Sequence, residues 1–405
     1  MSHELPPLKD YFKAADQGRL YKAVDPTGRY VKFKYSELVT FSGDWDDVTV
    51  NARGHVFDTK TGQCVLRPWS KFFNYQEIYQ PTGNTVELTS VGKILMGFPG
   101  LAPDITGKFY AMDKLDGSLI IAGMTPEGDL MVTSSGSFES KHAIWARNWL
   151  RTNGAGPGRF AKGRTYMFEM IADEDLHPIR YNYEGCVLLG IVDNASGTEI
   201  RYGMLKDDPL VIHTGMRVAD LVIPPGTKTI SEALELVSGL PASKEGIVLT
   251  FESGFKVKMK GKEFLALQKL FHSLSPKYLI ANFDTDRLQF KPEVMMAIPE
   301  EFPELREFAS DMRYRIVDGL SRAYGIAYVV ANMEMERRDV YALVSSVLKD
   351  IPDMGPKLVG IAMDCYGKLQ KGEARWEDMA RGRDELVKYI ARNINNTETK
   401  DTEDA

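Results

Sequence analysis

The spacing of hydrophobic residues changes once along the chain, near residue 265. Before this point, short apolar or alternating runs are separated by turns rich in glycine, proline and aspartate, which is typical of β-structure. Beyond it, apolar residues recur with the helical period over the segments 303–324, 328–348, 356–369 and 376–392. The pattern therefore predicts an α+β region of antiparallel sheets and helices, followed by an all-α region.

Several runs in the α+β region predict individual elements. Residues 30–35 alternate between apolar and polar side chains, which indicates a half-buried strand. Amphipathic segments near 140–150 and 231–237 predict helices. Continuous apolar runs predict buried strands at 119–122, 166–171 and 185–192.

The change of pattern divides the chain into three predicted parts. The α+β domain covers residues 1–264, and the helical domain covers residues 265–395. The remaining residues, 396–405, form an acidic tail that is expected to be disordered.

Composition limits the class of protein only broadly. The formal net charge of −6 argues against a general nucleic-acid coat protein but allows an enzyme with one local basic groove. The three cysteines lie far apart and the six histidines lack paired spacing, so no structural zinc site is expected. No apolar run could span a bilayer and the chain starts without a signal-peptide pattern, so we expect a cytoplasmic monomer with no membrane partner.

The stretch from Asp113 to Ser118 carries the most specific chemical signal. Lys114 stands two residues before Asp116, at the head of the predicted strand 119–122. A lysine at the edge of a sheet, beside other charges and partly removed from water, is favoured in its neutral, nucleophilic form. The spacing Lys-x-Asp-Gly is the signature of enzymes that attach a nucleoside monophosphate to lysine. A solvated turn lysine is the alternative interpretation of this motif alone.

Further positions supply groups that such chemistry needs. Glu169 lies in a buried apolar run, where an ionised acid requires a cation, a metal or a hydroxyl partner. A predicted hairpin begins just before Glu245, and the period of two in its second strand places Lys256, Lys258 and Lys260 on one face. These lysines repel one another unless an anion lies over them, or they form a solvated edge of the sheet.

Four short motifs follow one another in the sequence: Lys-x-Asp-Gly-Ser at 114–118, Phe-Glu-x-Ile at 168–171, Glu-Gly-x-Val at 245–248 and Val-Lys-x-Lys at 257–260. Together they resemble the ordered motifs of covalent nucleotidyltransferases, the superfamily of nucleic-acid ligases and mRNA capping enzymes. Upstream, Ala52-Arg53-Gly54 and Ser70-Lys71-Phe72-Phe73-Asn74 resemble a narrower group, the phage-type RNA ligase 1 family of the T-even phage tRNA-repair ligase and its relatives. The resemblance covers nearly the whole chain.

The resemblance implies a role for each of these residues. Lys114 corresponds to the lysine that becomes adenylylated, and Asp116 is expected to orient its loop or a metal-bound water. Glu169 corresponds to the acid that binds the ribose or a metal ion, and Glu245 to a second acid linked to the metal. The implied contacts to ATP and its phosphates come from Tyr35, Arg53, Lys71, Lys258 and Lys260.

The same resemblance implies the fold and the activity. Residues 1–264 would form an adenylation (nucleotidyltransferase) domain, and the helical domain would be a candidate for RNA specificity. Lys114 would take AMP from ATP with the help of Mg²⁺ or Mn²⁺, the AMP would pass to an RNA 5′-phosphate, and a 3′-hydroxyl would displace it. The implied partners are RNA ends, in single-stranded RNA or nicked tRNA, and a phage-encoded enzyme would act in the host cytoplasm.

Some features leave alternatives open. Ser135 stands where the family commonly has a basic residue, and the segment 175–179 matches the family only loosely. Lys256 is an alternative first lysine of the last motif, although the helix expected from Glu263 favours the later register. A DNA ligase or capping enzyme would share the motifs but usually carries an OB-fold after them. A catalytically silent RNA-binding relative would not need the full set of site residues, which are Lys114, Glu169, Glu245, Lys258 and Lys260.

Overall fold

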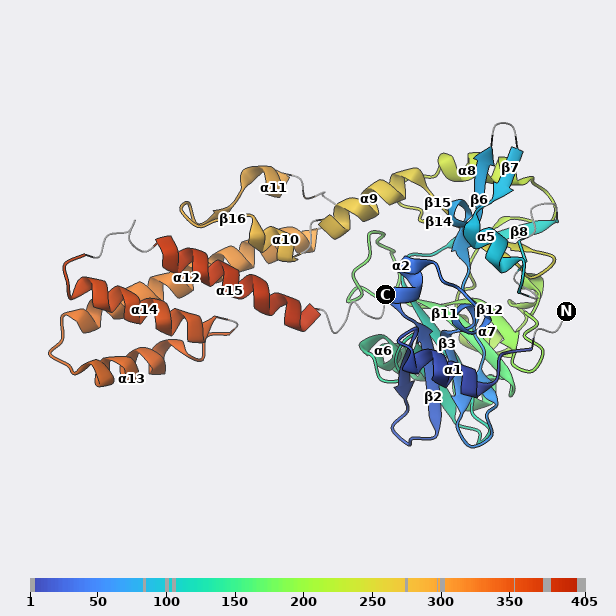
Figure 1. Ribbon diagram of the computed structural model, residues 1–405, viewed down its shortest axis with the longest axis horizontal. Coiled ribbons are helices and arrows are strands. Elements are labelled where there is room, and N and C mark those ends of the chain that lie inside the picture. Colours follow the sequence, from blue (N-terminus) through green and yellow to red (C-terminus); the bar gives the residue numbers. More distant parts are fainter. Residues whose placement is uncertain are drawn as a thin grey trace. The chain divides into compact units, whose positions relative to one another are not determined.

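The computed structural model of the chain describes residues 4–82, 85–98, 102–103, 107–273, 276–296, 298, 303–352, 354–373 and 380–398. The chain divides into two compact units, Met1–Gln268 and Lys269–Thr402, within the helix α9 (Lys262–Ser273) (Figure 1). Each unit is described by itself. The α+β class, with antiparallel sheets and a helical C-terminal region, is confirmed.

The first unit begins with a four-stranded antiparallel sheet, formed by β1 (Leu20–Val24), β2 (Tyr30–Tyr35), β3 (Arg53–Asp58) and β4 (Cys64–Leu66). The strand predicted at 30–35 is present, but the prediction that it is half-buried is wrong. Its first four residues are all buried, including Lys32. The Lys32 ammonium donates a hydrogen bond to Thr133 Oγ1 at 2.6 Å, which offsets part of the cost of its burial.

Two larger sheets form the body of this unit. The first has the order β10-β9-β11-β12, with β9 (Ser118–Met124), β10 (Leu130–Ser134), β11 (Arg164–Ile171) and β12 (Gly185–Asp193). The second has the order β13-β8-β14-β15-β5, with β5 (Phe73–Asn74), β8 (Phe109–Lys114), β13 (Leu221–Ile223), β14 (Gly246–Phe251) and β15 (Lys256–Lys260). All neighbouring strands are antiparallel except β15 and β5. A small hairpin, β6 (Tyr79–Thr82) and β7 (Thr85–Leu88), stands apart.

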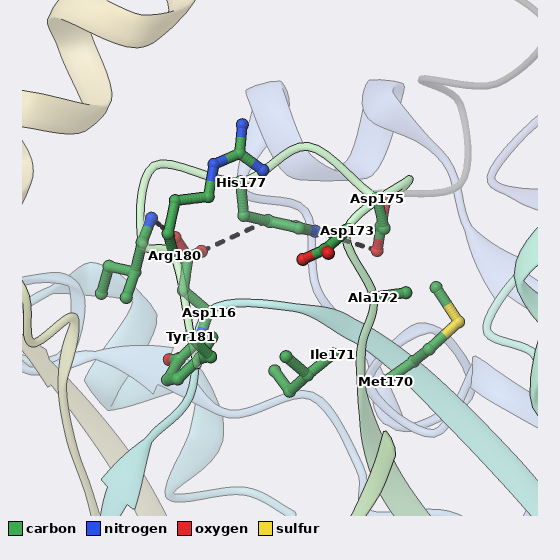
Figure 2. A pocket seen from close by; sticks show the side chains of 10 residues that line it. Asp116, Met170, Ile171, Ala172, Asp173, Asp175, His177, Arg180 and Tyr181 are labelled. Carbon is green, nitrogen blue, oxygen red and sulfur yellow. Dashed lines mark hydrogen bonds and ion pairs between the residues drawn. The ribbon is translucent and has the colours of Figure 1, made fainter. Parts of the chain in front are cut away.

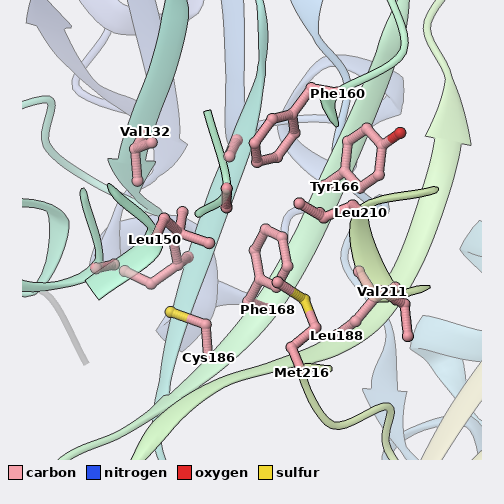
Figure 3. Close-up of a cluster of buried hydrophobic side chains, with 14 of the residues drawn as sticks. Val132, Leu150, Phe160, Tyr166, Phe168, Cys186, Leu188, Leu210, Val211 and Met216 are labelled. Atoms are coloured by element: carbon pink, nitrogen blue, oxygen red, sulfur yellow. The ribbon is translucent and has the colours of Figure 1, made fainter. Parts of the chain in front are cut away.

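The two large sheets pack against each other, and each has its own layer of helices on the opposite face. Met112 of β8 shares a buried cluster with Met167 of β11, which joins the sheets. Under α6, the other face of β9 and β11 forms a second cluster with Leu150, Phe168 and neighbouring residues (Figure 3). The helices of this unit are α1 (Leu8–Asp16), α2 (Glu37–Ser42), α3 (Asp47–Val50), α4 (Tyr75–Ile78), α5 (Ser90–Leu95), α6 (Lys141–Thr152), α7 (Pro209–Thr214) and α8 (Ile230–Ser238), with 3₁₀ turns Pro157–Arg159 and Tyr202–Met204.

Burial on both faces explains the continuous apolar run that predicted the strand at 119–122. Ile120 and Ala122 lie in the cluster under α6, whereas Ile121 packs with Val56 and Leu66 of the N-terminal sheet. Alternate residues of a strand point to opposite faces, so both sets must be apolar here. The strand therefore runs through the centre of the unit and fixes the position of the turn before it.

The second unit is predominantly helical. It contains α10 (Pro276–Ala281), α11 (Pro292–Met296), α12 (Pro303–Ala331), α13 (Arg337–Leu348), α14 (Gly355–Leu369) and α15 (Ala380–Glu398), together with the short hairpin β16 (Phe283–Asp284) and β17 (Gln289–Phe290). Helix α12 packs mainly against α14. Among the residues that the structure describes, no helix is both long and apolar enough to cross a membrane.

The predicted helix limits in this unit need three corrections. The predicted break between residues 324 and 328 is wrong, because α12 continues to Ala331 and keeps Ala327 and Val330 buried on its apolar face. Helix α13 begins only at Arg337. Helix α15 extends to Glu398, so residues 396–398 of the predicted disordered tail are helical. The rest of that tail and the predicted helical residues 376–379 lie outside the described residues.

Replacing Gly117 by alanine is expected to destabilise the fold. A Cβ at Gly117 would lie 2.4 Å from the carbonyl oxygen of Met170 and 3.0 Å from Cγ of Glu169, and overpacking of this kind costs about 1–3 kcal/mol. Thermal unfolding followed by circular dichroism measures the effect. Gly156→Ala is the matched control, since nothing lies within 4 Å of its added Cβ. Equal midpoints for wild type and Gly117→Ala would contradict the close approach of this turn to β11.

Candidate active site

Lys114 is the last residue of β8, at the end of the five-stranded sheet where β15 also ends and β14 begins. It pairs in register with Gly246 at the start of β14, and Gly246 pairs with Lys260 at the end of β15. Neighbouring strands are only about 4.8 Å apart, so the backbone holds the two lysines close together. The same register places Glu245, the residue before Gly246, at this edge.

Glu245 joins the two lysines through both oxygens of its carboxylate. Its Oε2 lies 2.6 Å from Lys114 Nζ, and its Oε1 lies 3.0 Å from Lys260 Nζ. Only 3% of the Glu245 side chain is exposed, so water and salt screen these ion pairs weakly. The structure thus brings the predicted nucleophile, one predicted acid and one predicted phosphate-binding lysine into direct contact.

Lys258 is surrounded by other cations. It lies on the same face of β15 as Lys260, while Val257 and Met259 point into the apolar core on the other side. Burial lowers the pKa of Lys258 to about 7, and nearby positive charges contribute to this shift: those of Lys71, Lys114, Arg53 and Lys260. Concentrated positive charge in a partly buried position favours the binding of an anion.

Lys71 is enclosed by aromatic rings. Its Nζ lies 5.2 Å from the ring centre of Tyr35, 5.5 Å from that of Trp45 and 5.1 Å from that of Phe73. The faces of aromatic rings attract cations, so these contacts hold the ammonium in place. The structure therefore places Tyr35, a predicted phosphate contact, against the cation that would bind the phosphate.

Arg53 at the start of β3 adds a buried guanidinium. It lies 4.8 Å from the ring centre of Phe72, and its Nη1 is buried without a hydrogen-bond partner among the described residues. Burial lowers the pKa of Arg53, and an unsatisfied buried cation is costly unless an anion accepts its hydrogen bond. A Cβ built on the next residue, Gly54, would lie 3.0 Å from the carbonyl oxygen of Ser135. The position where the family commonly has a basic residue is therefore close to Arg53.

Glu169 brings a second acid to Lys114 from the neighbouring sheet. Burial raises its pKa to about 7; the charge of Lys114 opposes this rise, whereas the charges of Glu245 and Asp116 add to it. Glu169 and Glu245 therefore repel each other when both are ionised. Carboxylate oxygens are the ligands that Mg²⁺ and Mn²⁺ prefer, and a divalent cation relieves such repulsion. Glu169 and Glu245 supply two oxygen donors of this kind, and among the described residues no group of three or more acid, histidine or cysteine side chains is placed to hold a metal ion.

The Asp116 carboxylate is held by the loop between β11 and β12 (Figure 2). Its Oδ2 accepts the backbone N–H of Ile179 at 3.1 Å, and its Oδ1 lies 3.4 Å from Nδ1 of His177. The backbone N–H of Asp116 donates to Tyr181 Oη at 2.9 Å. The turn that follows Lys114 is therefore tied to one loop at three points.

The sequence analysis missed His177, Asp175 and His142. Nε2 of His177 lies 3.1 Å from Oδ2 of Asp175, and the other oxygen of Asp175 lies 3.1 Å from Nε2 of His142 on α6. The six histidines have no paired spacing, and the segment 175–179 matches the family only loosely, so neither pattern indicates these residues. A signal that could have identified Asp175 and His177 is the presence of an acid and a histidine in the loop directly after the strand that carries Glu169, whereas nothing in the sequence relates His142 to them.

Lys256 shares the lysine face of β15 but does not join the cluster around Lys114. Its Nζ lies 2.7 Å from Oε2 of Glu199 and 4.4 Å from the ring centre of Trp69. Lys256 and Lys71 both line a cavity of about 980 Å³ between the sheets. Lys114, Lys258 and Lys260 do not line this cavity. Lys258 and Lys260, rather than Lys256, are therefore the lysines placed near Lys114.

Comparison with known proteins identifies the family. A family profile described as RNA ligase matches residues 51–264, which is more than half of the chain. The protein therefore belongs to this RNA ligase family. The matched segment includes every predicted site residue except Tyr35.

Individual relatives are distant. A Thermovibrio ammonificans protein, provisionally named as an RNA ligase, is 30% identical over 149 residues, which are 36% of this chain and 34% of the relative. The chain thus spans about a third of the length of that curated relative. An archaeal ATP-dependent RNA ligase structure is 14% identical, with a TM-score of 0.44, over 76% of this chain and 75% of its own. A Naegleria gruberi RNA ligase structure with ATP and Mn is 16% identical, with a TM-score of 0.33, over 40% and 52%.

Replacing Glu169 by glutamine is expected to stabilise the protein more at pH 8 than at pH 5. A carboxyl whose pKa is raised to about 7 by burial favours its protonated form in the folded state, so wild type loses stability as the pH rises from about 4.5 to about 7. Glutamine has no proton to lose. The measurement is the midpoint of thermal unfolding at both pH values with a chelator present, and about 1 kcal/mol shifts such a midpoint by ~2–4 °C.

Glu235→Gln, at an exposed position on α8, is the matched control for this comparison. Its midpoint relative to wild type should not change between the two pH values. The burial argument for Glu169 is wrong if both variants show the same pH dependence as wild type.

Proposed function

We propose that this protein is an ATP-dependent RNA ligase that joins 5′-phosphate and 3′-hydroxyl ends through a lysyl-AMP intermediate on Lys114. The observation that carries the proposal is the group of partly buried cations around Lys258, which favours an anion close to Lys114. The triphosphate of ATP supplies such an anion. Membership of the RNA ligase family supports RNA as the nucleic acid that is joined.

In the first step, Lys114 Nζ attacks the α-phosphorus of ATP. A nitrogen–phosphorus bond forms, the bond to the pyrophosphate oxygen breaks, and a proton leaves Nζ. Glu245 Oε2, which lies 2.6 Å from Nζ, is placed to accept this proton. Lys258, Lys260 and Arg53 would stabilise the negative charge that builds up on the phosphate oxygens.

The remaining site residues bind and orient the nucleotide. Glu169 and Glu245 would hold Mg²⁺ or Mn²⁺, which when bound supplies positive charge that neutralises the phosphates. Lys71, fixed by its aromatic neighbours, would contact the outer phosphates together with Arg53. Glu169 would also contact the ribose, since its protonated form can donate a hydrogen bond near neutral pH.

Two later steps complete the reaction. AMP passes from Lys114 to the 5′-phosphate of an RNA, and the 3′-hydroxyl of a second RNA end then attacks this activated phosphate and releases AMP. We assign residues 1–264 as the adenylation domain and residues 265–395 as a domain for RNA specificity. The helical character of the second unit supports an RNA ligase over a DNA ligase or capping enzyme, which usually carry an OB-fold there.

We further propose single-stranded RNA ends, including those of nicked tRNA, as the partners, and tRNA repair as the process served. The protein would act as a monomer in the cytoplasm, that of the host cell if a phage encodes it. The support for these finer points is the resemblance of the motifs to the phage-type RNA ligase 1 family.

Lys114→Ala is expected to abolish covalent attachment of AMP, because the nucleophile is removed. Wild type and variant are incubated with Mg²⁺ and ATP labelled at the α-phosphate, and the label bound to protein is measured after denaturing electrophoresis. Wild type should retain the label and Lys114→Ala should retain none. Lys162→Ala, at an exposed position, is the control and should be labelled like wild type.

The acceptor and the nucleotide are tested in the same experiment. Label on wild type should move to a 5′-phosphorylated single-stranded RNA, and ligated RNA should follow. Label from GTP in place of ATP would favour a capping enzyme, and transfer to DNA alone would favour a DNA ligase. A wild-type protein freed of AMP that takes up no label would leave a catalytically silent RNA-binding relative as the better interpretation.

Lys258→Gln is expected to slow the formation of lysyl-AMP by about 100-fold, the usual cost of losing one group that stabilises developing charge. The rate is measured in a single turnover at saturating labelled ATP. Lys162→Gln provides the matched control. If Lys258→Gln reacts as fast as this control, the partly buried cations do not stabilise the transferred phosphate, and the central observation behind the proposal loses its support.

A further inference from the structure

A network of four contacting side chains connects helix α6 with the turn after Lys114. His142 on α6 contacts Asp175, Asp175 contacts His177, and His177 contacts Asp116. All four are largely buried, with 6% of His142, 11% of Asp175, 20% of His177 and 8% of Asp116 exposed. Figure 2 shows His177 lying between the two carboxylates.

The geometry defines the protonation of His177. Its Nδ1 faces Oδ1 of Asp116 and its Nε2 faces Oδ2 of Asp175. An ionised carboxylate only accepts hydrogen bonds, so both ring nitrogens must carry protons for both contacts to form. Burial alone would lower the pKa of His177, but its bonds to Asp116 and Asp175 raise it to about 10. The same bonding from His142 and His177 outweighs burial and holds the pKa of Asp175 well below its usual range.

The first residue of this network, His142, lies on a firmly packed helix. Ser140 caps the start of α6 by accepting the N–H of Ala143, and the buried residues Ala143, Ala146 and Leu150 fix the helix on the sheet. His142 therefore presents its Nε2 to Asp175 from a firmly packed element. The position of Asp116 is thus determined by a helix and a loop as well as by its own turn.

We propose that His177 is a positioning residue of the adenylylation site. As an imidazolium between Asp116 and Asp175, it fixes the Asp116 carboxylate and the turn that carries Lys114. This inference rests on the proposed function and deepens it, since it assigns a role to a loop that the sequence motifs leave out. His177 acts through Asp116 and not on the nucleotide directly.

Two substitutions separate the two contacts of His177. In His177→Asn the amide N–H takes the place of Nδ1 and retains the bond to Asp116. In His177→Gln the amide N–H takes the place of Nε2 and retains the bond to Asp175. If the role of His177 is to hold Asp116, the glutamine variant is slower than the asparagine variant, although both keep one donor.

The measurement is the single-turnover formation of lysyl-AMP over a range of labelled ATP concentrations. His177→Gln should lower the rate constant at saturating ATP by about 10- to 100-fold, the scale of a misplaced catalytic group. The ATP concentration that gives half of the maximal rate should change little. A merely unstable variant would instead lose the amount of label at an unchanged rate constant. His213→Gln, at an exposed position on α7, is the control and should match wild type.

A double-substitution cycle tests the route through Asp116. If His177 acts only by holding Asp116, then combining His177→Gln with Asp116→Asn is no slower than Asp116→Asn alone. If the double variant is slowed by the product of the two single effects, His177 has a role independent of Asp116, and the proposal is overturned. Equal rates for His177→Gln, His177→Asn and wild type would overturn it as well.

A spectroscopic measurement covers the case in which the His177 variants fail to fold. In wild type labelled with ¹⁵N-histidine, one imidazole should remain protonated at both nitrogens at pH 8, and its signals should shift in Asp116→Asn. A neutral His177 at that pH would overturn the proposal. Wild type that takes up no label from ATP refutes the proposed function itself, whereas labelled wild type with unaffected variants refutes only the role of His177.

Discussion

The site depends on positive charge held away from water. Arg53, Lys71 and Lys258 converge in a partly buried space, where burial lowers the pKa of Lys258 and the charges of the other cations lower it further. Such an arrangement is unfavourable in the protein alone, since each group loses hydration and repels the next. The fold sustains it through aromatic rings around Lys71 and through the double ion pair of Glu245. An anionic substrate would turn this cost into binding energy.

Two acids, Glu245 and Glu169, lie beside these cations and interact with their charges. Glu245 is shared between Lys114 and Lys260, whereas Glu169 has its pKa raised to about 7 by burial despite the nearby Lys114. Two carboxylates close together thus have different environments. Glu245 forms ion pairs with two lysines, whereas Glu169 can gain or lose a proton near neutral pH. This difference follows from their position, one at a strand end and the other within a buried strand.

The α+β class followed from the hydrophobic periodicity of the sequence. The grouping of Lys114 with Glu245 and Lys260 followed from the resemblance of the ordered motifs to those of covalent nucleotidyltransferases. The sequence was insufficient for the network behind Asp116. The bonds of His177 and His142 join segments that neither period nor motif relates, so only the folded chain brings them together. The burial of Lys32 was missed for the same reason, since its partner Thr133 lies in another sheet.

The alternation of lysine and apolar residues along β15 limits how the sequence of this protein can change. Lys256, Lys258 and Lys260 lie on one face of the strand, while Val257 and Met259 lie in the core on the other. A shift of one residue in the pairing with β14 would exchange these two sets and place three lysines among apolar side chains. The turn that joins β14 to β15 must therefore keep a length that preserves this pairing. Among diverging relatives, insertions should be excluded from this turn even where the sequence around it has changed.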